Sequence, residues 1–427
     1  MKPFNLKKSA ILERIVVLIL LVLVSVVGFA VPPVGSEYIE FKGIVIDKET
    51  KSPLAFTNIN VNGTNISTVT NTEGEFSIKI FKEDINEKIS FKFIGYKNKS
   101  VLPSEFVDYK AKIELEPIAI ELPEVSVISK DAESLVLAML EKKAENYSKK
   151  DMQLTSFYRE TIKKNRIYVS LSEAVVDIFK QSYTSYKSDV VKMYKARKKT
   201  DYVKLDTVIF KLQGGPFNSL YLDIMKYPDL IFTDKITENY VFRFDRSTKM
   251  DNRLIYVIDF KQNPSNPDPL YYGKLYIDAQ NLALKSAVFN LNIENKEESG
   301  RLFIIKKPLN AKLHPVNANY RVDYFEKDGL WYYGYSRIEL GLRINWKRKL
   351  FNTTYYSTIE MATTDYEMAE NAKPARGKDR LKPNVIVSDE VTGFSDPDFW
   401  GEFNVIEPEK SIESAIKKIQ KQLERKN

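Results

Sequence analysis

The stretch that decides the N-terminal fold is GIVIDKETKSPLAFTNINVNGT, residues 43–64. Apolar and polar residues alternate in it in short runs, which is typical of half-buried strands. The pattern continues in TVTNTEGEFSIKI, residues 68–80, and in ISFKFIGYKNKSV, residues 89–101. Residues suited to tight turns separate the runs, namely Lys51-Ser52-Pro53, Asn62-Gly63 and Glu73-Gly74. Six or seven short strands at this spacing predict a small β-sandwich over residues 38–116.

These stretches resemble the carboxypeptidase-regulatory-like domain, a transthyretin-like sandwich found at the N-termini of many Gram-negative envelope proteins, including TonB-dependent transporters. The motifs follow the family's order: Gly-x-Val-x-Asp, a Pro-Leu pair, a turn closing on Gly-x-Phe, and Phe-x-Phe-Ile-Gly-Tyr. The resemblance implies a fold and no activity. Metallocarboxypeptidases hold zinc with two histidines and a carboxylate, whereas this chain has one histidine, His314, and no cysteine. We therefore expect no carboxypeptidase activity, no metal and no cofactor.

The first thirty residues predict an export signal. Four basic residues precede or flank an apolar stretch over residues 15–27, and Gly28 and Ala30 are small, as a signal peptidase requires. An uncleaved N-terminal anchor is the alternative. Loss of residues 1–30 removes four of the 65 basic and one of the 57 acidic residues, which lowers the net charge from +8 to +5. This mild excess suits a membrane surface or an acidic partner rather than nucleic acid, and we expect a protein of the periplasm or outer membrane.

The rest of the chain predicts a mainly β protein with few helices. Apolar residues recur at helical spacing from Asp131, which predicts a helix of about sixteen residues in a linker over residues 117–151. Residues 152–370 are rich in β-branched and aromatic residues, which favours a larger antiparallel β domain. Residues 271–293 resemble strands of the curved half-barrels of envelope lipoprotein carriers. Residues 371–427 predict a loop and a C-terminal amphipathic helix, whose apolar stripe is Ile412, Ala415, Ile416, Ile419 and Leu423.

The whole chain also resembles a group of uncharacterised envelope proteins that join this sandwich to such a β region. The resemblance rests on these landmarks: Phe157-Tyr158-Arg159-Glu160, Glu173-Ala174, Gly214-Gly215-Pro216, Asp398-Phe399-Trp400 and Glu407-Pro408.

Paired carboxylates are the strongest catalytic candidates, because glycosidases need only two. Glu160 and Glu173 could face one cavity together with Arg159. An ion pair across adjacent strands is the commoner arrangement for such residues, and we expect that structural role. His314 precedes Pro315 in a predicted turn and lacks a recognisable triad, so we expect it to be structural.

Two segments are candidates for binding a partner. The first is the basic cluster that includes Lys195, Arg197, Lys198 and Lys199, which would suit lipid headgroups or an acidic protein; a solvated face is the alternative. The second is Gly214-Gly215-Pro216-Phe217, which predicts a turn and could expose Phe217 at the tip of a binding loop.

From these features we predict a non-catalytic cell-envelope protein that binds another macromolecule, for example as an accessory subunit of an outer-membrane β-barrel complex. Two alternatives stay open. One is a lipid or lipoprotein carrier that uses a half-barrel cavity, and the other is a hydrolase built on paired carboxylates.

Overall fold

The computed structural model describes residues 37–118, 131–200, 214–250, 252–303, 311–347, 352–370, 372–390, 399–414 and 417. The predicted signal peptide and most of the predicted C-terminal helix lie outside these residues. The described chain is mainly β, as predicted, with few helices. None of its helices within the described ranges has both the length and the apolar character needed to cross a bilayer.

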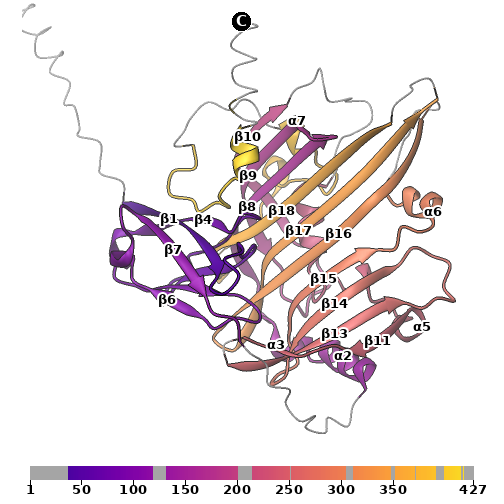
Figure 1. The fold of residues 1–427 in the computed structure, drawn as a ribbon, viewed down its shortest axis with the longest axis horizontal. Coiled ribbons are helices and arrows are strands. Elements are labelled where there is room, and N and C mark those ends of the chain that lie inside the picture. Colours follow the sequence, from indigo (N-terminus) through magenta and orange to yellow (C-terminus); the bar gives the residue numbers. More distant parts are fainter. Residues whose placement is uncertain are drawn as a thin grey trace, which may run out of the picture.

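The N-terminal unit is a sandwich of two small sheets (Figure 1), with strand orders β4-β1-β7 and β3-β2-β5-β6. Its elements are β1 (Tyr38–Asp47), β2 (Asn58–Val61), β3 (Ser67–Val69), β4 (Glu75–Phe81), η1 (Lys82–Asp84), β5 (Ile89–Lys92), β6 (Lys99–Val101), η2 (Pro103–Glu105) and β7 (Lys110–Leu115). Phe76 and Phe91 meet edge to face in the core, with ring centroids 5.3 Å apart. Gly74 has φ +74°, and a Cβ there would lie 2.6 Å from the Val45 carbonyl oxygen, so the Gly-x-Phe turn needs glycine.

Two short helices connect the units where the sequence predicts one helix of about sixteen residues. They are α2 (Ala132–Glu141) and α3 (Lys143–Asn146). The Asp131 carboxylate caps α2 by accepting a hydrogen bond from the Ser134 N–H at 2.7 Å, as the sequence indicates. Tyr147 follows α3 and is buried, and its hydroxyl donates a hydrogen bond to the Leu284 carbonyl at 2.9 Å. The prediction of a helix here is confirmed, but its single span is wrong.

The larger unit is one open antiparallel sheet of eleven strands. Ten strands follow the order β10-β9-β8-β18-β17-β16-β15-β14-β13-β11, and β12 pairs with β13. The strands are β8 (Met152–Lys164), β9 (Ile167–Lys180), β10 (Val190–Thr200), β11 (Tyr240–Phe244), β12 (Thr248–Met250), β13 (Arg253–Gln262), β14 (Tyr271–Asp278), β15 (Leu284–Leu291), β16 (Ala311–Lys327), β17 (Leu330–Trp346) and β18 (Thr353–Met368). The shorter helical elements are α4 (Pro216–Tyr221), η3 (Pro228–Leu230), α5 (Ile236–Asn239), α6 (Lys296–Arg301), η4 (Gly377–Asp379) and α7 (Val387–Glu390).

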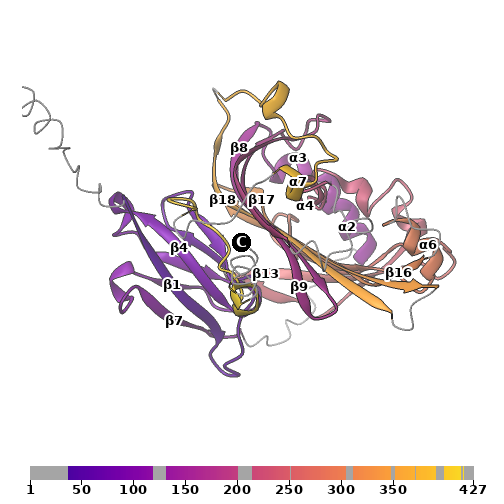
Figure 2. The same ribbon diagram turned by 90° about the horizontal axis from the view of Figure 1, so that it is seen from above.

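The two faces of this curved sheet are covered by different parts of the chain (Figure 2). Helices α2 and α4 lie on one face, where Tyr158 and Val176 join their core. The sandwich and the C-terminal segment, residues 399–414, lie on the other face, where Phe157 and Val175 pack with Trp400. This division follows from the strand period of two, since successive side chains point to opposite faces.

Candidate functional site

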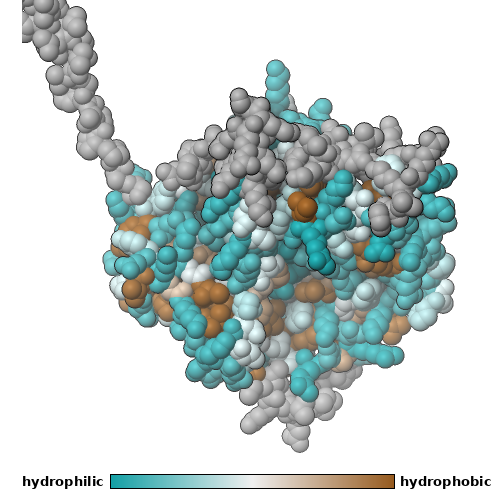
Figure 3. All heavy atoms as spheres, turned by 45° about the horizontal axis from the view of Figure 1, so that its top comes forward, coloured by the Kyte–Doolittle hydropathy of each residue, from teal (hydrophilic) through white to brown (hydrophobic). Residues whose placement is uncertain are grey.

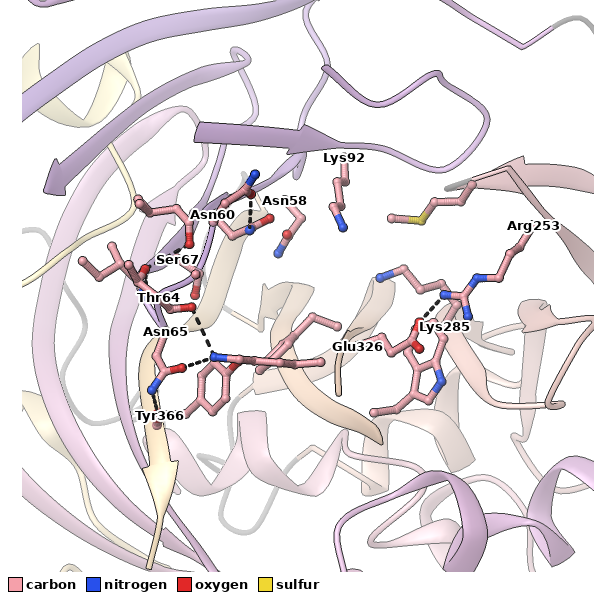
Figure 4. A pocket seen from close by; sticks show the side chains of 18 of the residues that line it. Asn58, Asn60, Thr64, Asn65, Ser67, Lys92, Arg253, Lys285, Glu326 and Tyr366 are labelled. Atoms are coloured by element: carbon pink, nitrogen blue, oxygen red, sulfur yellow. Dashed lines mark hydrogen bonds and ion pairs between the residues drawn. The ribbon is translucent and has the colours of Figure 1, made fainter. Parts of the chain in front are cut away.

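A cleft of about 240 Å³, lined by both polar and apolar side chains, lies where the sandwich meets the large sheet (Figure 4). The sandwich contributes the β2–β3 hairpin and the end of β5, while the large sheet contributes β13, β15 and the β16–β17 hairpin. The cleft therefore forms only because residues 58–92 and residues 250–366 are brought together.

Asparagines line the sandwich side of the cleft because of the alternation in β2. Ile59 and Val61 are fully buried in the sandwich core, so Asn58 and Asn60 point the other way, into the cleft. The Asn60 side-chain amide donates to Asn62 Oδ1 at 3.4 Å. Amide side chains offer both donors and acceptors to a ligand.

Four cations and one carboxylate also line the cleft. They are Lys92, Arg253, Lys285, Lys327 and Glu326. Arg253 bonds to Glu326, and its Nε lies 3.2 Å from a carboxylate oxygen of Asp278. Lys327 Nζ donates to Asn65 Oδ1 and to the Thr64 carbonyl, which fastens the sandwich to the large sheet.

Trp331 forms an aromatic base for these charges. Its side chain is 1% exposed, and the Lys285 ammonium and Arg253 guanidinium lie 5.3 and 5.6 Å from its ring centroid. Lys285 is itself only 8% exposed, and its Nζ donates to the Tyr324 carbonyl. Cations held over an aromatic face in a partly dry site attract an anion more strongly than solvated cations do. The arrangement can therefore bind an anionic group.

On the face of the large sheet that meets the sandwich, charged residues form a ladder across five strands. Arg197, Glu173, Arg159, Glu360 and Arg337 stand directly opposite one another on β10, β9, β8, β18 and β17. Arg159 Nε lies 2.7 Å from Glu173 and its Nη1 lies 3.2 Å from Glu360, while Arg197 Nε lies 2.8 Å from Glu173. The predicted structural ion pair between Arg159 and Glu173 is confirmed.

The C-terminal segment covers this ladder. Arg159 Nη2 donates to the Ile406 carbonyl at 2.7 Å, and Trp400 meets Phe157 edge to face with centroids 5.4 Å apart. The side-chain amide of Asn404 pairs with the backbone of Lys79 in the sandwich, at 2.7 and 3.2 Å. The segment thus connects the two units at the ladder.

Glu160 points to the opposite face of the sheet from Glu173. Arg159 stands opposite Glu173, so the next residue along β8 faces the other way. Glu160 is buried and accepts a hydrogen bond from the Tyr158 hydroxyl at 2.8 Å. Burial raises the pKa of the Glu160 carboxyl to about 7, although the Tyr158 hydrogen bond acts to lower it. The expectation that Glu160 and Glu173 could share one cavity is wrong, because a sheet separates them.

Comparison with known proteins identifies the sandwich. Residues 41–127 match the family model described as CarboxypepD_reg-like domain. The sandwich is a CarboxypepD_reg-like domain. The predicted resemblance is confirmed for this part of the chain. No curated protein matches the chain.

Several solved structures are distantly similar to part of this chain. A DUF1329 family protein from Desulfovibrio piger is 10% identical, with 57% of this chain and 96% of that chain covered and a TM-score of 0.24. A LolA superfamily protein from Nitrosomonas europaea is 10% identical, covering 55% and 94%, with a TM-score of 0.19. MucB is also 10% identical, covering 55% and 93%, with a TM-score of 0.18. Likenesses this distant carry no functional argument.

The predicted basic cluster packs in part against the C-terminal segment. Arg197 is committed to Glu173 and lies over the Trp400 ring, 4.8 Å from its centroid, and Lys195 lies over Phe399 at 4.7 Å. Lys198 lies on the same strand, β10, and the side chain of Lys199 lies outside the described residues. Arg197 therefore stabilises the fold, and partner binding by Lys195 and Lys198 stays a prediction.

The glycine segment lies on the opposite side of the sheet from the CarboxypepD_reg-like domain. Gly214, Gly215, Pro216 and Phe217 are all buried, and Phe217 packs into the main core at 4% exposure. The Gly214 N–H donates to the Val385 carbonyl at 2.9 Å, which ties the segment to the chain before α7. The expectation of an exposed aromatic tip is wrong, because residues far along the chain cover it.

His314 lies within β16, opposite Arg343, rather than in the predicted turn. Partial burial and the neighbouring cations Lys296 and Arg343 lower the pKa of its imidazole. Within the described residues, no cluster of three or more histidine, cysteine, aspartate or glutamate side chains could hold a metal ion.

Sequence reasoning missed the cleft. One signal was present, because Asn58 and Asn60 of β2, and Asn62 just after it, alternate with Ile59 and Val61 in the CarboxypepD_reg-like domain. Three polar amides at alternate positions indicate a surface with a polar role. The cations of the large sheet gave no such signal, since they lie on three different strands.

Proposed function

We propose that the protein is a non-catalytic binding protein of the cell envelope, and that its junction cleft receives an acidic segment of another envelope protein. The observation that supports this most is the excess of cations around the cleft, where four line it and two carboxylates, Glu326 and Asp278, both pair with Arg253. An incoming carboxylate would meet Lys92 and Lys285, with asparagine amides beside them (Figure 4). Charge-assisted hydrogen bonds of this kind are roughly twice as strong as neutral ones.

The size of the cleft favours a side chain of a larger partner over a free small molecule. Pockets for drug-sized ligands have volumes of about 300–1,000 Å³, and this cleft has about 240 Å³. It is large enough for one or two acidic side chains that belong to a partner resting on the surface. The hydrophobic residues on the face in Figure 3 form small separate patches in a mainly hydrophilic surface, which suits a polar contact of this kind.

The roles of the buried carboxylates support a non-catalytic protein. Glu173 and Glu360 are bound by arginines, and Glu160 lies on the other face of the sheet. Lipid carriage is the alternative, and it would use the face that α2 and α4 cover. In the described residues, that face packs against its own helices and loops through side chains such as Met139, Phe217 and Leu220.

Titration with a peptide tests the cleft. Hexaglutamate should change the tryptophan fluorescence of the protein, because Trp331 forms the base of the cleft, while hexaglutamine should not. Lys92→Gln should weaken hexaglutamate binding at least tenfold, since a hydrogen bond to a charged group contributes about 1.5–3 kcal/mol. Lys82→Gln, an equal charge change on an exposed residue of the CarboxypepD_reg-like domain, is the control. Equal binding by the two variants, or equal binding of the two peptides, would contradict the proposal.

A further inference from the structure

A second charged surface lies at the end of the large sheet that is farthest from the cleft. The cleft contacts the β16–β17 hairpin near Trp331, whereas this end holds the first residues of β16 and the last residues of β17. The 17 residues of β16 separate the two ends by about 50 Å. The surface is therefore independent of the proposed cleft.

The strand register brings four segments to this end. Lys164 pairs with Ile167 across the β8–β9 hairpin and with Tyr355 of β18, Tyr355 pairs with Leu342 of β17, and Leu342 pairs with Pro315 of β16. We call the segments 162–168, 311–315, 342–347 and 352–356 the basic tip. They contain no aspartate or glutamate, and their lysines and arginines are Lys163, Lys164, Arg166, Lys312, Arg343 and Lys347. Four acidic residues lie near these segments. Glu297 and Glu298 of α6 pair with Arg301 in the same helix, Glu409 accepts a hydrogen bond from the Tyr168 hydroxyl at 3.4 Å, and Glu339 lines the same hollow as Lys163 and Arg166.

Apolar and aromatic side chains lie among these cations. Ile167 is 58% exposed and Tyr356 is 40% exposed. Arg166, Lys312, Arg343 and Lys347 are exposed around them. Lys163 Nζ lies 4.3 Å from the ring centroid of Tyr168. This mixture of cations with single exposed apolar side chains is typical of surfaces that enter the headgroup region of a bilayer.

The basic tip is held rigidly. A small separate core of Ile162, Val169, Leu342, Ile344 and Tyr355 packs beneath it. The hairpin turn is fixed to β18, because the Asn165 N–H donates to the Thr354 carbonyl at 2.6 Å and the Thr354 N–H donates to Asn165 Oδ1 at 3.0 Å. The cations are thus presented in one arrangement, and binding would cost little ordering of the backbone.

We infer that the basic tip docks onto the surface of an anionic lipid membrane. The lysines and arginines would contact headgroup phosphates, and Ile167 and Tyr356 would enter the interface between headgroups and acyl chains. An array of cations drawn from four segments suits the extended negative surface of a bilayer, which attracts nearby basic residues. Such docking would place the cleft about 50 Å from the membrane, where it could reach a partner that projects from the same membrane.

Cosedimentation with lipid vesicles tests this inference with the full chain. The protein should pellet with vesicles of equal parts phosphatidylglycerol and phosphatidylcholine and remain in solution with pure phosphatidylcholine. Lys164→Gln combined with Arg166→Gln should weaken binding about 25-fold, since each cation at the surface contributes about fivefold. Lys82→Gln combined with Lys88→Gln makes the same charge change on exposed residues of the sandwich and should leave binding unchanged. Ile167→Ser should weaken binding without any change of charge.

Three results would overturn the inference. They are equal binding by the two double variants, equal binding to the two kinds of vesicle, and failure of the wild-type protein to bind anionic vesicles. Far-ultraviolet circular dichroism and thermal melting of each variant separate loss of binding from loss of fold. An adduct to an envelope protein from a photo-crosslinker at position 166, without any vesicle binding, would identify a protein partner instead and would also overturn it.

Discussion

Replacement of Glu173 by glutamine should destabilise the protein strongly, because this carboxylate lies between two arginines of the ladder. Glu173 is fully buried, and its two oxygens lie 2.7 Å from Arg159 Nε and 2.8 Å from Arg197 Nε. Glutamine keeps the shape but has no charge, and its NH₂ group would face the donor of one arginine. Removal of one partner from a buried ion pair costs about 3–5 kcal/mol. We expect Glu173→Gln to lower the free energy of unfolding by about this amount at pH 7.

Urea unfolding followed by tryptophan fluorescence measures this change. Glu116→Gln is a matched control, because Glu116 also lies between two cations, Lys48 and Lys97, but on the exposed surface. Its loss should cost far less than the loss of Glu173, because solvent screens an exposed ion pair. Burial acts to raise the pKa of Glu173, but Arg159 and Arg197 outweigh it and hold that pKa below its usual value. The wild-type advantage over Glu173→Gln is therefore present above about pH 4.5 and should be lost as the pH falls through the lowered pKa. A loss of stability no larger than that of Glu116→Gln would refute the idea that the ladder holds the sheet and the C-terminal segment together.

Three further substitutions test the structure. Glu160→Gln should behave in the opposite way to Glu173→Gln. Because the pKa of the Glu160 carboxyl is raised to about 7, the wild type loses stability as the pH rises from about 4.5 to 7. Thermal melts at pH 5 and pH 8 should therefore show that the variant is more stable than the wild type at pH 8, by up to about 3 kcal/mol. Trp400→Ala should lower the free energy of unfolding in urea by about 3–5 kcal/mol, because Trp400 packs on Phe157 beneath the sandwich. The same substitution should expose residues 399–407 to limited proteolysis. Unchanged proteolysis would show that other contacts hold the segment. Gly74→Ala should lower the melting temperature of the sandwich, since its Cβ would lie 2.6 Å from the Val45 carbonyl oxygen at a φ of +74°; an unchanged melting temperature would mean that the turn relaxes at no cost.

The sandwich could be predicted well because its structure depends on local patterns. Ile59 and Val61 alternate with asparagines, and the positive φ of Gly74 accounts for the Gly-x-Phe turn. Short-range signals in the sequence also predict the cap of α2 by Asp131 and the open antiparallel sheet. The alternation of side chains along a strand also explains why Glu173 belongs to the ladder and Glu160 does not, because it places the two glutamates on opposite faces of the sheet.

The remaining features depend on contacts between distant residues. Phe217 is buried because the chain near Val385 folds over its turn, and a glycine pair in sequence gives no sign of that cover. The cleft joins Asn58 and Lys92 of the sandwich to Lys285 and Trp331 of the large sheet, so it exists only once the two units have packed. Periodicity reports which face of a strand is buried, but it does not report which other strand that face meets.

The most direct test of the binding cleft is site-specific photo-crosslinking in intact cells. A photoreactive amino acid at Lys92 should yield one major adduct with another envelope protein, and Lys285→Gln should reduce that adduct because Lys285 lines the same cleft. The same group at Lys82, an exposed residue of the sandwich, should not yield it. Failure to form any adduct from Lys92, or an identical adduct pattern from both positions, would contradict a binding role for the cleft.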